Sequence, residues 1–197
     1  MMTMEIKKIN PESTNPLCVF GVADTPAGRE IEKEMRAWLE PNYNLIEIWH
    51  DGSLFEQPAL RYMQDLVIET GKPCLYVHSK GAYRRPELSA DIRQMWKHEF
   101  TVNRDLYFGL VNRPYAVVAC PTTGNDKTTW YNGFVVNRRA MLEIPPIEPN
   151  TNRYVFERLF IGTRPQVIGV MRNDLHRSEK FIHEKTYAAW NQIKETL

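Results

Sequence analysis

The stretch 17-LCVFGVADTPAGREIEKEMRAWLEPNYNLIEIWH-50 decides the fold, because an apolar run, a helical pattern and a second apolar run follow one another in it. The runs 17–23 and 44–50 are short and bounded by turn residues, which is typical of strands buried on both faces. Between them, Asp24-Thr25-Pro26 supplies a capping residue and an early proline, and Pro41 ends the helical pattern. The stretch therefore predicts a strand–helix–strand unit.

The same alternation continues along the next part of the chain. Pro58 opens a second helical pattern that Gly71 ends, and the apolar run 74–79 predicts a third strand. A long helix is predicted over 87–111. Strands that alternate with helices predict an α/β fold, in which a mostly parallel, Rossmann-like sheet is joined by right-handed crossovers.

The second half of the chain has a less regular pattern. A fourth strand is predicted over 115–121, and 128–142 is typical of a strand that turns directly into a short helix. A helix over 154–162 and a short strand over 165–171 follow. The segment 178–197 has apolar residues at helical spacing, which predicts an amphipathic helix.

Length and composition indicate one ordinary domain. We expect residues 1–16 to form a loose lead-in and 17–197 to form a single domain of the 197-residue chain. A net charge of +1 argues against a protein that grips nucleic acid. The N-terminus lacks the apolar core of a signal peptide and no stretch is long enough for a membrane span, so we expect a cytoplasmic protein without a transmembrane segment. The three cysteines lie in apolar runs, as small buried thiols do.

Ligands bind to open parallel sheets at the carboxyl ends of the strands, and polar residues follow the predicted strands here. Asp24, His50-Asp51 and the segment 121–126 stand at three such ends. The stretch 74-CLYVHSKGAYRR-85 is the sharpest case, because its cations suit an anionic group such as a diphosphate. In the alternative interpretation, its histidine makes a local hydrogen bond and its lysine is solvated. His50-Asp51 as metal ligands is the weaker interpretation, because Asp51 is followed by glycine, as in a turn.

Motifs of three other enzyme classes are absent from the sequence. It contains no Gly-x-x-x-x-Gly-Lys-Ser/Thr loop, no Gly-x-Gly-x-x-Gly fingerprint and no Gly-x-Ser-x-Gly elbow. These absences lower the expectation of a P-loop nucleotidase, a dinucleotide-dependent dehydrogenase or a serine hydrolase.

Four stretches resemble, in the same order, motifs of a family of small glycosyltransferase-like proteins of bacteria and large viruses. The first, 55-FEQPALRYMQDLVIETGKPCLYVHSKGA-82, is similar to a helix and strand of that family that end in Leu-Tyr-Ile-His-Thr-Lys-Gly. The stretch 92-IRQMWKHEF-100 is a degraded match to a Trp-Arg-like helix. WYNGFVVNRRAMLEIP (130–145) and NRYVFERLFIG (152–162) are similar to the last two motifs.

The resemblance implies a GT-A-like, three-layer α/β/α fold that binds a nucleotide-sugar and transfers the sugar to a glycan or another acceptor. In that interpretation Lys80 would neutralise the charge that builds on the diphosphate. Tyr131 and Asn132 would lie beside the sugar, although Trp130 and Tyr131 are equally explained as core residues. The residues expected to contact the nucleotide-sugar are Asp24, His78, Ser79, Lys80, Gly81, Trp130, Tyr131, Asn132 and Gly133.

The resemblance also implies that Glu157 is the catalytic base or a carboxylate that orients the acceptor. The alternative is a solvated helix glutamate beside Arg158.

The chain departs from many GT-A enzymes in one respect, because it contains no Asp-x-Asp pair to hold Mn²⁺ or Mg²⁺. Three alternatives follow. Asp126 alone holds the metal ion, or Lys80 and an arginine replace it, or the chain binds its ligand without transferring sugar. The sequence thus predicts a nucleotide-sugar-dependent glycosyltransferase, with a catalytically inactive binding or interaction protein of the same fold as the alternative.

Overall fold

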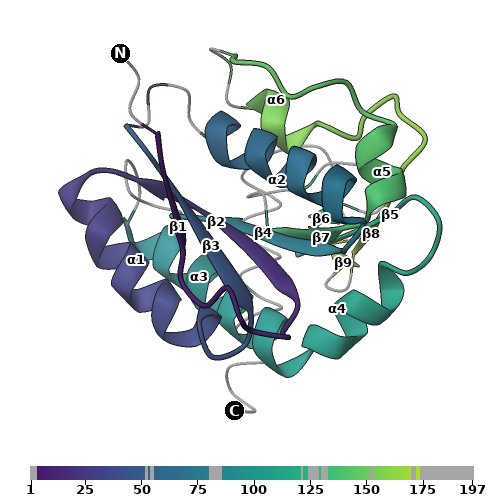
Figure 1. The fold of residues 1–197 in the computed structure, drawn as a ribbon. Coiled ribbons are helices and arrows are strands. Elements are labelled where there is room, and N and C mark those ends of the chain that lie inside the picture. The colour runs from purple at the N-terminus through teal and green to yellow at the C-terminus, as the bar shows by residue number, and fades with distance from the viewer. Residues whose placement is uncertain are drawn as a thin grey trace.

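In the computed structural model, seven strands form one mixed sheet with helices on both faces (Figure 1). The structure describes residues 4–51, 53, 56–79, 86–120, 122–123, 129, 133–150, 152, 154–169 and 172–173. The strands are β1 Met4–Lys8, β2 Leu17–Ala23, β3 Asn44–His50, β4 Cys74–His78, β5 Ala116–Ala119, β6 Thr122–Thr123, β7 Phe134–Val136, β8 Gln166–Gly169 and β9 Arg172–Asn173. The helices are α1 Pro26–Leu39, α2 Gln57–Thr70, α3 Pro86–Val102, α4 Arg104–Leu110, α5 Arg138–Leu142 and α6 Tyr154–Glu157.

The predicted strand–helix alternation from β2 to β4 is confirmed. β2 pairs in parallel with β3 on one side and with β4 on the other. The hydroxyl of Thr25 accepts a hydrogen bond of 3.0 Å from the amide of Gly28 and thereby caps α1, and Pro26 opens the helix. Gly71 ends α2 in the left-handed conformation, with φ of 70°.

The sheet is mixed, whereas the sequence predicted a mostly parallel one. Its strand order is β1-β3-β2-β4-β7-β5-β8. Five strands run in one direction, and β1 and β7 run in the other. The reversal at β7 arises because the chain returns after β5 and inserts a three-residue strand between β4 and β5. As predicted, this strand turns directly into the short helix α5.

The N-terminal segment differs from the loose lead-in that its polar composition suggested. Residues Met4–Lys8 form an edge strand, antiparallel to β3, in which Met4 lies opposite His50 and Lys8 opposite Ile46. Asn10 then holds the chain to the end of α1, because its side-chain amide donates to the carbonyl oxygens of Glu40 at 3.0 Å and Tyr43 at 2.6 Å.

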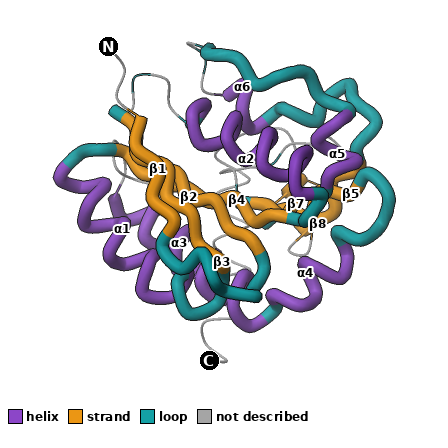
Figure 2. Tube along the Cα trace, in the orientation of Figure 1, coloured by secondary structure: helices purple, strands orange, loops and turns teal. Residues whose placement is uncertain are grey.

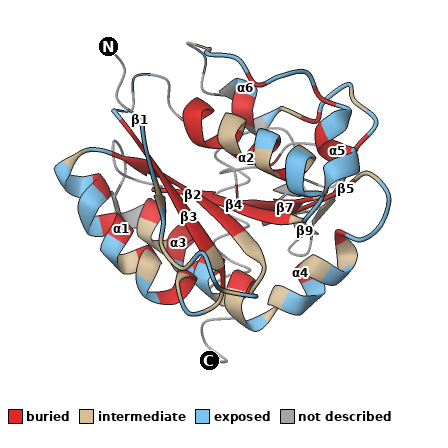
Figure 3. Ribbon diagram, in the orientation of Figure 1, coloured by how far each residue is buried: buried red, intermediate tan, exposed pale blue. Residues whose placement is uncertain are grey.

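Two hydrophobic clusters lie on opposite faces of the sheet. Helices α1, α3 and α4 cover one face, and α2, α5 and α6 cover the other (Figure 2). Strands β2, β3, β4, β5 and β7 are buried almost throughout, as the red ribbon in Figure 3 shows, whereas β1 is mostly exposed. The largest buried side chains under α1, α3 and α4 include Met35, Trp96, Phe100 and Tyr107, and those under α2, α5 and α6 include Met63, Phe134, Phe156 and Phe160.

The long helix predicted over 87–111 is two helices, because the chain breaks at Asn103 between α3 and α4. The helix predicted over 154–162 is confirmed only in its first turn, as α6. The amphipathic pattern of 178–197 falls outside the described residues. Within the part of the chain that the structure describes, no helix combines the length and the hydropathy that a membrane span requires.

Candidate functional site

The order of the strands reverses at β2, because β3 lies on one side of β2 and β4 on the other. Several polar residues lie at the carboxyl ends of these three strands. The chain runs from β2 through α1 to β3, then crosses over β2 through α2 to β4, so α1 and α2 lie on opposite faces. In α/β sheets, a ligand-binding crevice lies outside the carboxyl ends of the strands at such a switch point. Here His50 ends β3 and His78 ends β4, with Ala23 of β2 in register with His50 and Gly21 in register with His78.

His78 is held in place by a carboxylate and by two aromatic rings. Its Nδ1 lies 3.2 Å from Oε1 of Glu56, the residue that immediately precedes α2. Its ring is stacked on Tyr76, with an interplanar angle of 9°, and lies 5.7 Å from the ring centre of Trp96. Both side chains of the Glu56–His78 pair are mostly buried, with exposed fractions of 17% and 10%. An N–H donated from Nδ1 to a carboxylate fixes the tautomer and orientation of an imidazole.

His50 lies on the same face of the sheet as His78, on the other side of β2. The pKa of His50 is lowered to about 4, chiefly by burial and also by the positive charge that His78 can carry, while Glu56 and Asp51 act in the opposite direction. His50 is therefore neutral near pH 7. His50, Glu56 and His78 form a group of side chains that influence one another electrostatically, which is typical of functional sites.

Ser79 and Asp24, two further residues of the predicted ligand set, have different surroundings. The Ser79 hydroxyl accepts a hydrogen bond of 2.9 Å from the Ala23 amide, and the Ser79 amide donates to the carbonyl of Gly21 at 2.8 Å. Ser79 therefore joins the ends of β2 and β4 and keeps its hydroxyl proton for another partner. Asp24 is half-exposed at the rim and forms an ion pair of 2.6 Å with Arg29.

Two glycines allow α1 and α2 to pack closely against the carboxyl end of β2. A Cβ atom at Gly28 would lie 1.9 Å from the carbonyl oxygen of Ala23, so only glycine lets α1 begin there. A Cβ atom at Gly21 would lie 3.0 Å from Cβ of Ala59 in α2 and 3.2 Å from the Tyr76 hydroxyl. That hydroxyl is fully buried and has no hydrogen-bond partner among the described residues.

Gly133, expected beside the sugar, lies against Trp96. A Cβ atom at Gly133 would be 2.3 Å from Nε1 of Trp96, and that indole nitrogen donates to the carbonyl of Cys120 at 3.0 Å. Since Trp96 also contacts His78, Gly133 supports one wall of the site through packing.

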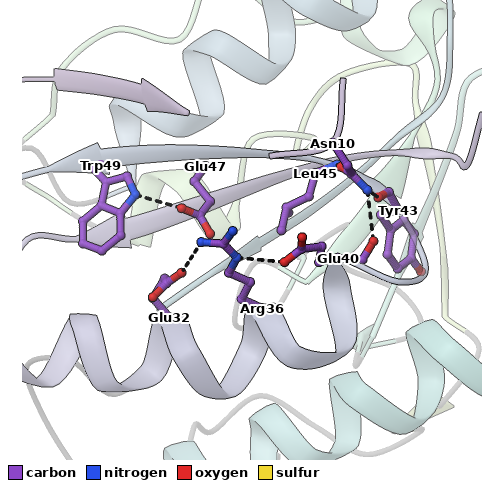
Figure 4. Close-up of polar contacts among 8 residues, drawn as sticks. All are labelled: Asn10, Glu32, Arg36, Glu40, Tyr43, Leu45, Glu47 and Trp49. Atoms are coloured by element: carbon purple, nitrogen blue, oxygen red, sulfur yellow. Dashed lines mark hydrogen bonds and ion pairs between the residues drawn. The ribbon is translucent and has the colours of Figure 1, made fainter. Parts of the chain in front are cut away.

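A network of three carboxylates and an arginine lies on the opposite face of β3, under α1, with Glu47 fully buried and Arg36 and Glu40 partly exposed (Figure 4). Trp49 donates from Nε1 to Oε2 of Glu47 at 3.0 Å, and Arg36 of α1 pairs with Glu32 at 3.4 Å and Glu40 at 2.9 Å. The other oxygen of Glu47 has no hydrogen-bond partner among the described residues. The pKa of Glu47 is raised to about 7, chiefly by burial, while the hydrogen bond from Trp49 acts against the rise and Glu32 adds to it.

Trp49 connects this network to the rim of the site. Its ring lies under two cations, with Nζ of Lys7 4.3 Å and the guanidinium carbon of Arg29 5.7 Å from its centre. Arg29 is also the ion-pair partner of Asp24. The rim therefore presents a cation and a carboxylate beside an aromatic ring.

Several residues of the predicted site fall outside what the structure describes. These are Lys80, Gly81, Asp126, Trp130, Tyr131, Asn132 and the side chain of Glu157. Asp51 accepts a hydrogen bond of 2.8 Å from the Ser53 amide, as expected for a turn. Among the described side chains, no group of three His, Cys, Asp or Glu residues is placed to hold a metal ion.

Sequence reasoning missed the partnership of Glu56 with His78 and the contact of Trp96 with both His78 and Gly133. These residues come from different elements, and no spacing in the sequence relates them. Glu56 and Trp96 stand in the stretches 55–82 and 92–100 that carry the family resemblance, and the sequence predicts no contact of either with His78. Comparison of the chain with protein-family models, curated proteins and solved structures found no match.

Proposed function

We propose that the protein binds a nucleotide-sugar at the carboxyl ends of β2, β3 and β4 and transfers the sugar to a glycan or another acceptor. The observation that carries this proposal is the Glu56–His78 pair, which lies beside His50 at the switch point of the sheet. The family resemblance of residues 55–82, which end in the His-Ser-Lys-Gly segment, supplies the reaction class.

In this reaction the acceptor oxygen forms a bond to the anomeric carbon of the sugar, and the bond from that carbon to the diphosphate breaks. The acceptor hydroxyl loses its proton, and the departing diphosphate gains negative charge. When it is unprotonated, an imidazole oriented by a carboxylate can take such a proton, which makes His78 a candidate base in addition to Glu157. The cations expected to stabilise the leaving group are Lys80 and the arginines that follow it.

The second candidate function is ligand binding without turnover. It is favoured by the lack of an Asp-x-Asp pair anywhere in the sequence. Binding and transfer differ in one product, the free nucleotide, so the two functions are separable by measurement.

The test is a thermal-shift panel of UDP-, GDP-, CMP- and dTDP-sugars, with and without Mn²⁺, followed by an assay for nucleotide release with and without acceptor sugars. A donor at about 100 times its dissociation constant stabilises the native state by about 2.7 kcal/mol and raises Tm by a few degrees. A shift with nucleotide release supports the transferase, and a shift without release supports the binding protein. If no donor shifts Tm, both candidate functions are wrong.

The matched variants are Lys80→Ala and Lys72→Ala. Lys80 follows the carboxyl end of β4, whereas Lys72 precedes its amino end and is exposed. We expect Lys80→Ala to weaken donor binding and Lys72→Ala to leave it unchanged, with the Tm of both free proteins close to that of the wild type. If the ligand-free Lys80→Ala protein has a Tm well below that of the wild type, the role of Lys80 is structural.

A further inference from the structure

Strand β1 leaves one edge of the sheet unpaired among the described strands, because β1 stands at the end of the strand order. The Ile9 amide donates to the Leu45 carbonyl at 2.9 Å, so Ile9 directs its backbone groups toward the β3 side. These directions alternate along an antiparallel strand. Met4, Ile6 and Lys8 therefore direct their amides and carbonyls outward, where they are available to another strand.

The side chains of β1 divide between the two faces of the sheet, with Met4, Ile6 and Lys8 on one and Glu5 and Lys7 on the other. Met4 and Ile6 lie on the α2 side of the sheet and have exposed fractions of 49% and 42%. Glu5 and Lys7 lie on the α1 side, opposite Trp49 and Glu47 of β3, and their side chains are 66% and 40% exposed. The unpaired backbone groups of an edge strand are a template to which a strand of another chain can pair.

We propose that two copies of this chain form a homodimer by antiparallel pairing of β1 with β1, with the two-fold axis at Ile6. In this register Ile6 lies opposite Ile6 of the partner subunit, and Met4 lies opposite Lys8 of the partner subunit. All three are residues whose backbone groups point outward, so the ladder hydrogen bonds of both strands are satisfied. The sheet of one protomer then continues into that of its partner.

Charge complementarity selects this register. With the axis at Ile6, Glu5 lies opposite Lys7 of the partner subunit, and the two-fold repeats the contact. Moving the axis to Glu5 places two glutamates opposite each other, and moving it to Lys7 places two lysines opposite each other, both of which are unfavourable. If one strand slides by one residue along the other, a residue whose amide and carbonyl point outward lies opposite one whose amide and carbonyl point toward β3. The hydrogen bonds between the two β1 strands are then lost.

The two-fold closes the assembly at two copies, because each β1 edge is used once. Because of the two-fold axis, the β3 strands of the two protomers are antiparallel. The two candidate sites therefore lie at opposite ends of the joined sheet, and the dimer does not depend on the proposed function.

The first experiment compares the wild-type protein, Glu5→Lys and the Glu5→Lys/Lys7→Glu double variant by sedimentation velocity over a concentration series. Glu5→Lys sets a lysine against Lys7 of the partner subunit in both contacts, so the dimer dissociation constant should rise roughly tenfold. The double variant exchanges the charges and should restore most of the dimer. Circular dichroism and Tm of each variant check that the protomer stays folded.

The second experiment tests the register by oxidation of single-cysteine variants. Directly opposed residues of a hydrogen-bonded antiparallel pair have Cα atoms about 5.5 Å apart, within the range of a disulfide. Ile6→Cys should therefore form a covalent dimer readily. Lys8→Cys, exposed on the same face of the same strand, should not, because it lies opposite Met4 of the partner subunit. The three native cysteines are buried and do not interfere.

The proposal is overturned by a monomer at every concentration, by a dimer that Glu5→Lys leaves unchanged, or by Lys8→Cys cross-linking as fast as Ile6→Cys. A dimer that dissociates on dilution, is weakened in Glu5→Lys and is regained in the double variant supports it.

Discussion

The imidazole of His78 and the carboxylate of Glu56 lie 3.2 Å apart and join the end of β4 to the start of α2. The Glu56 side chain makes no capping hydrogen bond to α2, so its contact with His78 is separable from helix stability. We expect Glu56→Gln to lower kcat of sugar transfer roughly 100-fold or more, because the imidazole loses its orienting anion. KM for the donor and Tm should change little.

Glu69→Gln is the matched control for this prediction, since Glu69 is exposed at the other end of α2. It should leave kcat, KM and Tm at their wild-type values. If Glu56→Gln lowers Tm by many degrees while kcat per folded molecule is retained, Glu56 is structural and the proposed role of the pair is wrong.

The contact between Gly133 and Trp96 leads to a second prediction. In Gly133→Ala the new Cβ would meet the indole, and Trp96 has little room to move because it is buried and bonded to Cys120. Overpacking of this kind costs about 1–3 kcal/mol, which urea unfolding would measure.

Gly109→Ala is its control, because nothing lies within 4 Å of a Cβ at Gly109 in α4. There the free energy of unfolding should stay unchanged or rise by up to about 1 kcal/mol, because alanine favours helix. Equal losses of stability in the two variants would contradict the packing argument.

The raised pKa of Glu47 leads us to expect that the free energy of unfolding depends on pH. Its pKa rises from 4.5 to about 7 in the folded protein, so the native state retains a proton that the unfolded chain releases. This contribution is present at low pH and is lost as pH rises between about 4.5 and 7. In Glu47→Gln, the free energy of unfolding relative to wild type should therefore rise with pH over this window, by at most about 1.4 kcal/mol per pH unit for one proton. Glu30→Gln, an exposed change in α1, should show no such trend.

The lowered pKa of His50 leads us to expect the opposite dependence of stability on pH, over nearly the same pH range. Its pKa falls from 6.5 to about 4 on folding, so the wild-type protein loses stability as pH falls through this range. The stability of His50→Gln relative to wild type should be highest near pH 4 and decline toward pH 6.5. Because Glu47 and His50 lie on opposite faces of β3, we expect the two effects to add in the double variant. Denaturant unfolding at half-unit pH steps measures all three curves, and a wild-type-like curve for either single variant would contradict its part of the prediction.

Sequence reasoning was most successful from β2 to β4. The strands there are continuous apolar runs, and proline, glycine and capping residues mark the helix ends, so local patterns determine each element. It failed at β1, where Met4 and Ile6 alternate with charged residues, as is common in an edge strand with one exposed side. It also missed the reversal of β7, because the direction of a strand depends on the path of the chain and not on its periodicity.

The candidate site was predicted only in part, because local patterns locate strand ends but not contacts between elements. The position of His78 at a strand end follows from the pattern of the run that it closes. Its partners do not, since Glu56 and Trp96 reach it only through the crossing of α2 and the packing of α3. Contacts between elements are set by tertiary structure, and a single sequence carries no local sign of them.

The three-residue strand β7 has a consequence for synthesis on the ribosome. Among the described strands, β5 and β8 reach the rest of the sheet only through β7, which pairs with β4 on one side and β5 on the other. The strands β1 to β4 can pair as soon as they emerge, but β5 must wait until Phe134–Val136 has been translated before it can be hydrogen-bonded into the sheet. The edge of β4 therefore stays unpaired in the nascent chain until that moment, and unpaired strand edges of this kind are prone to aggregate.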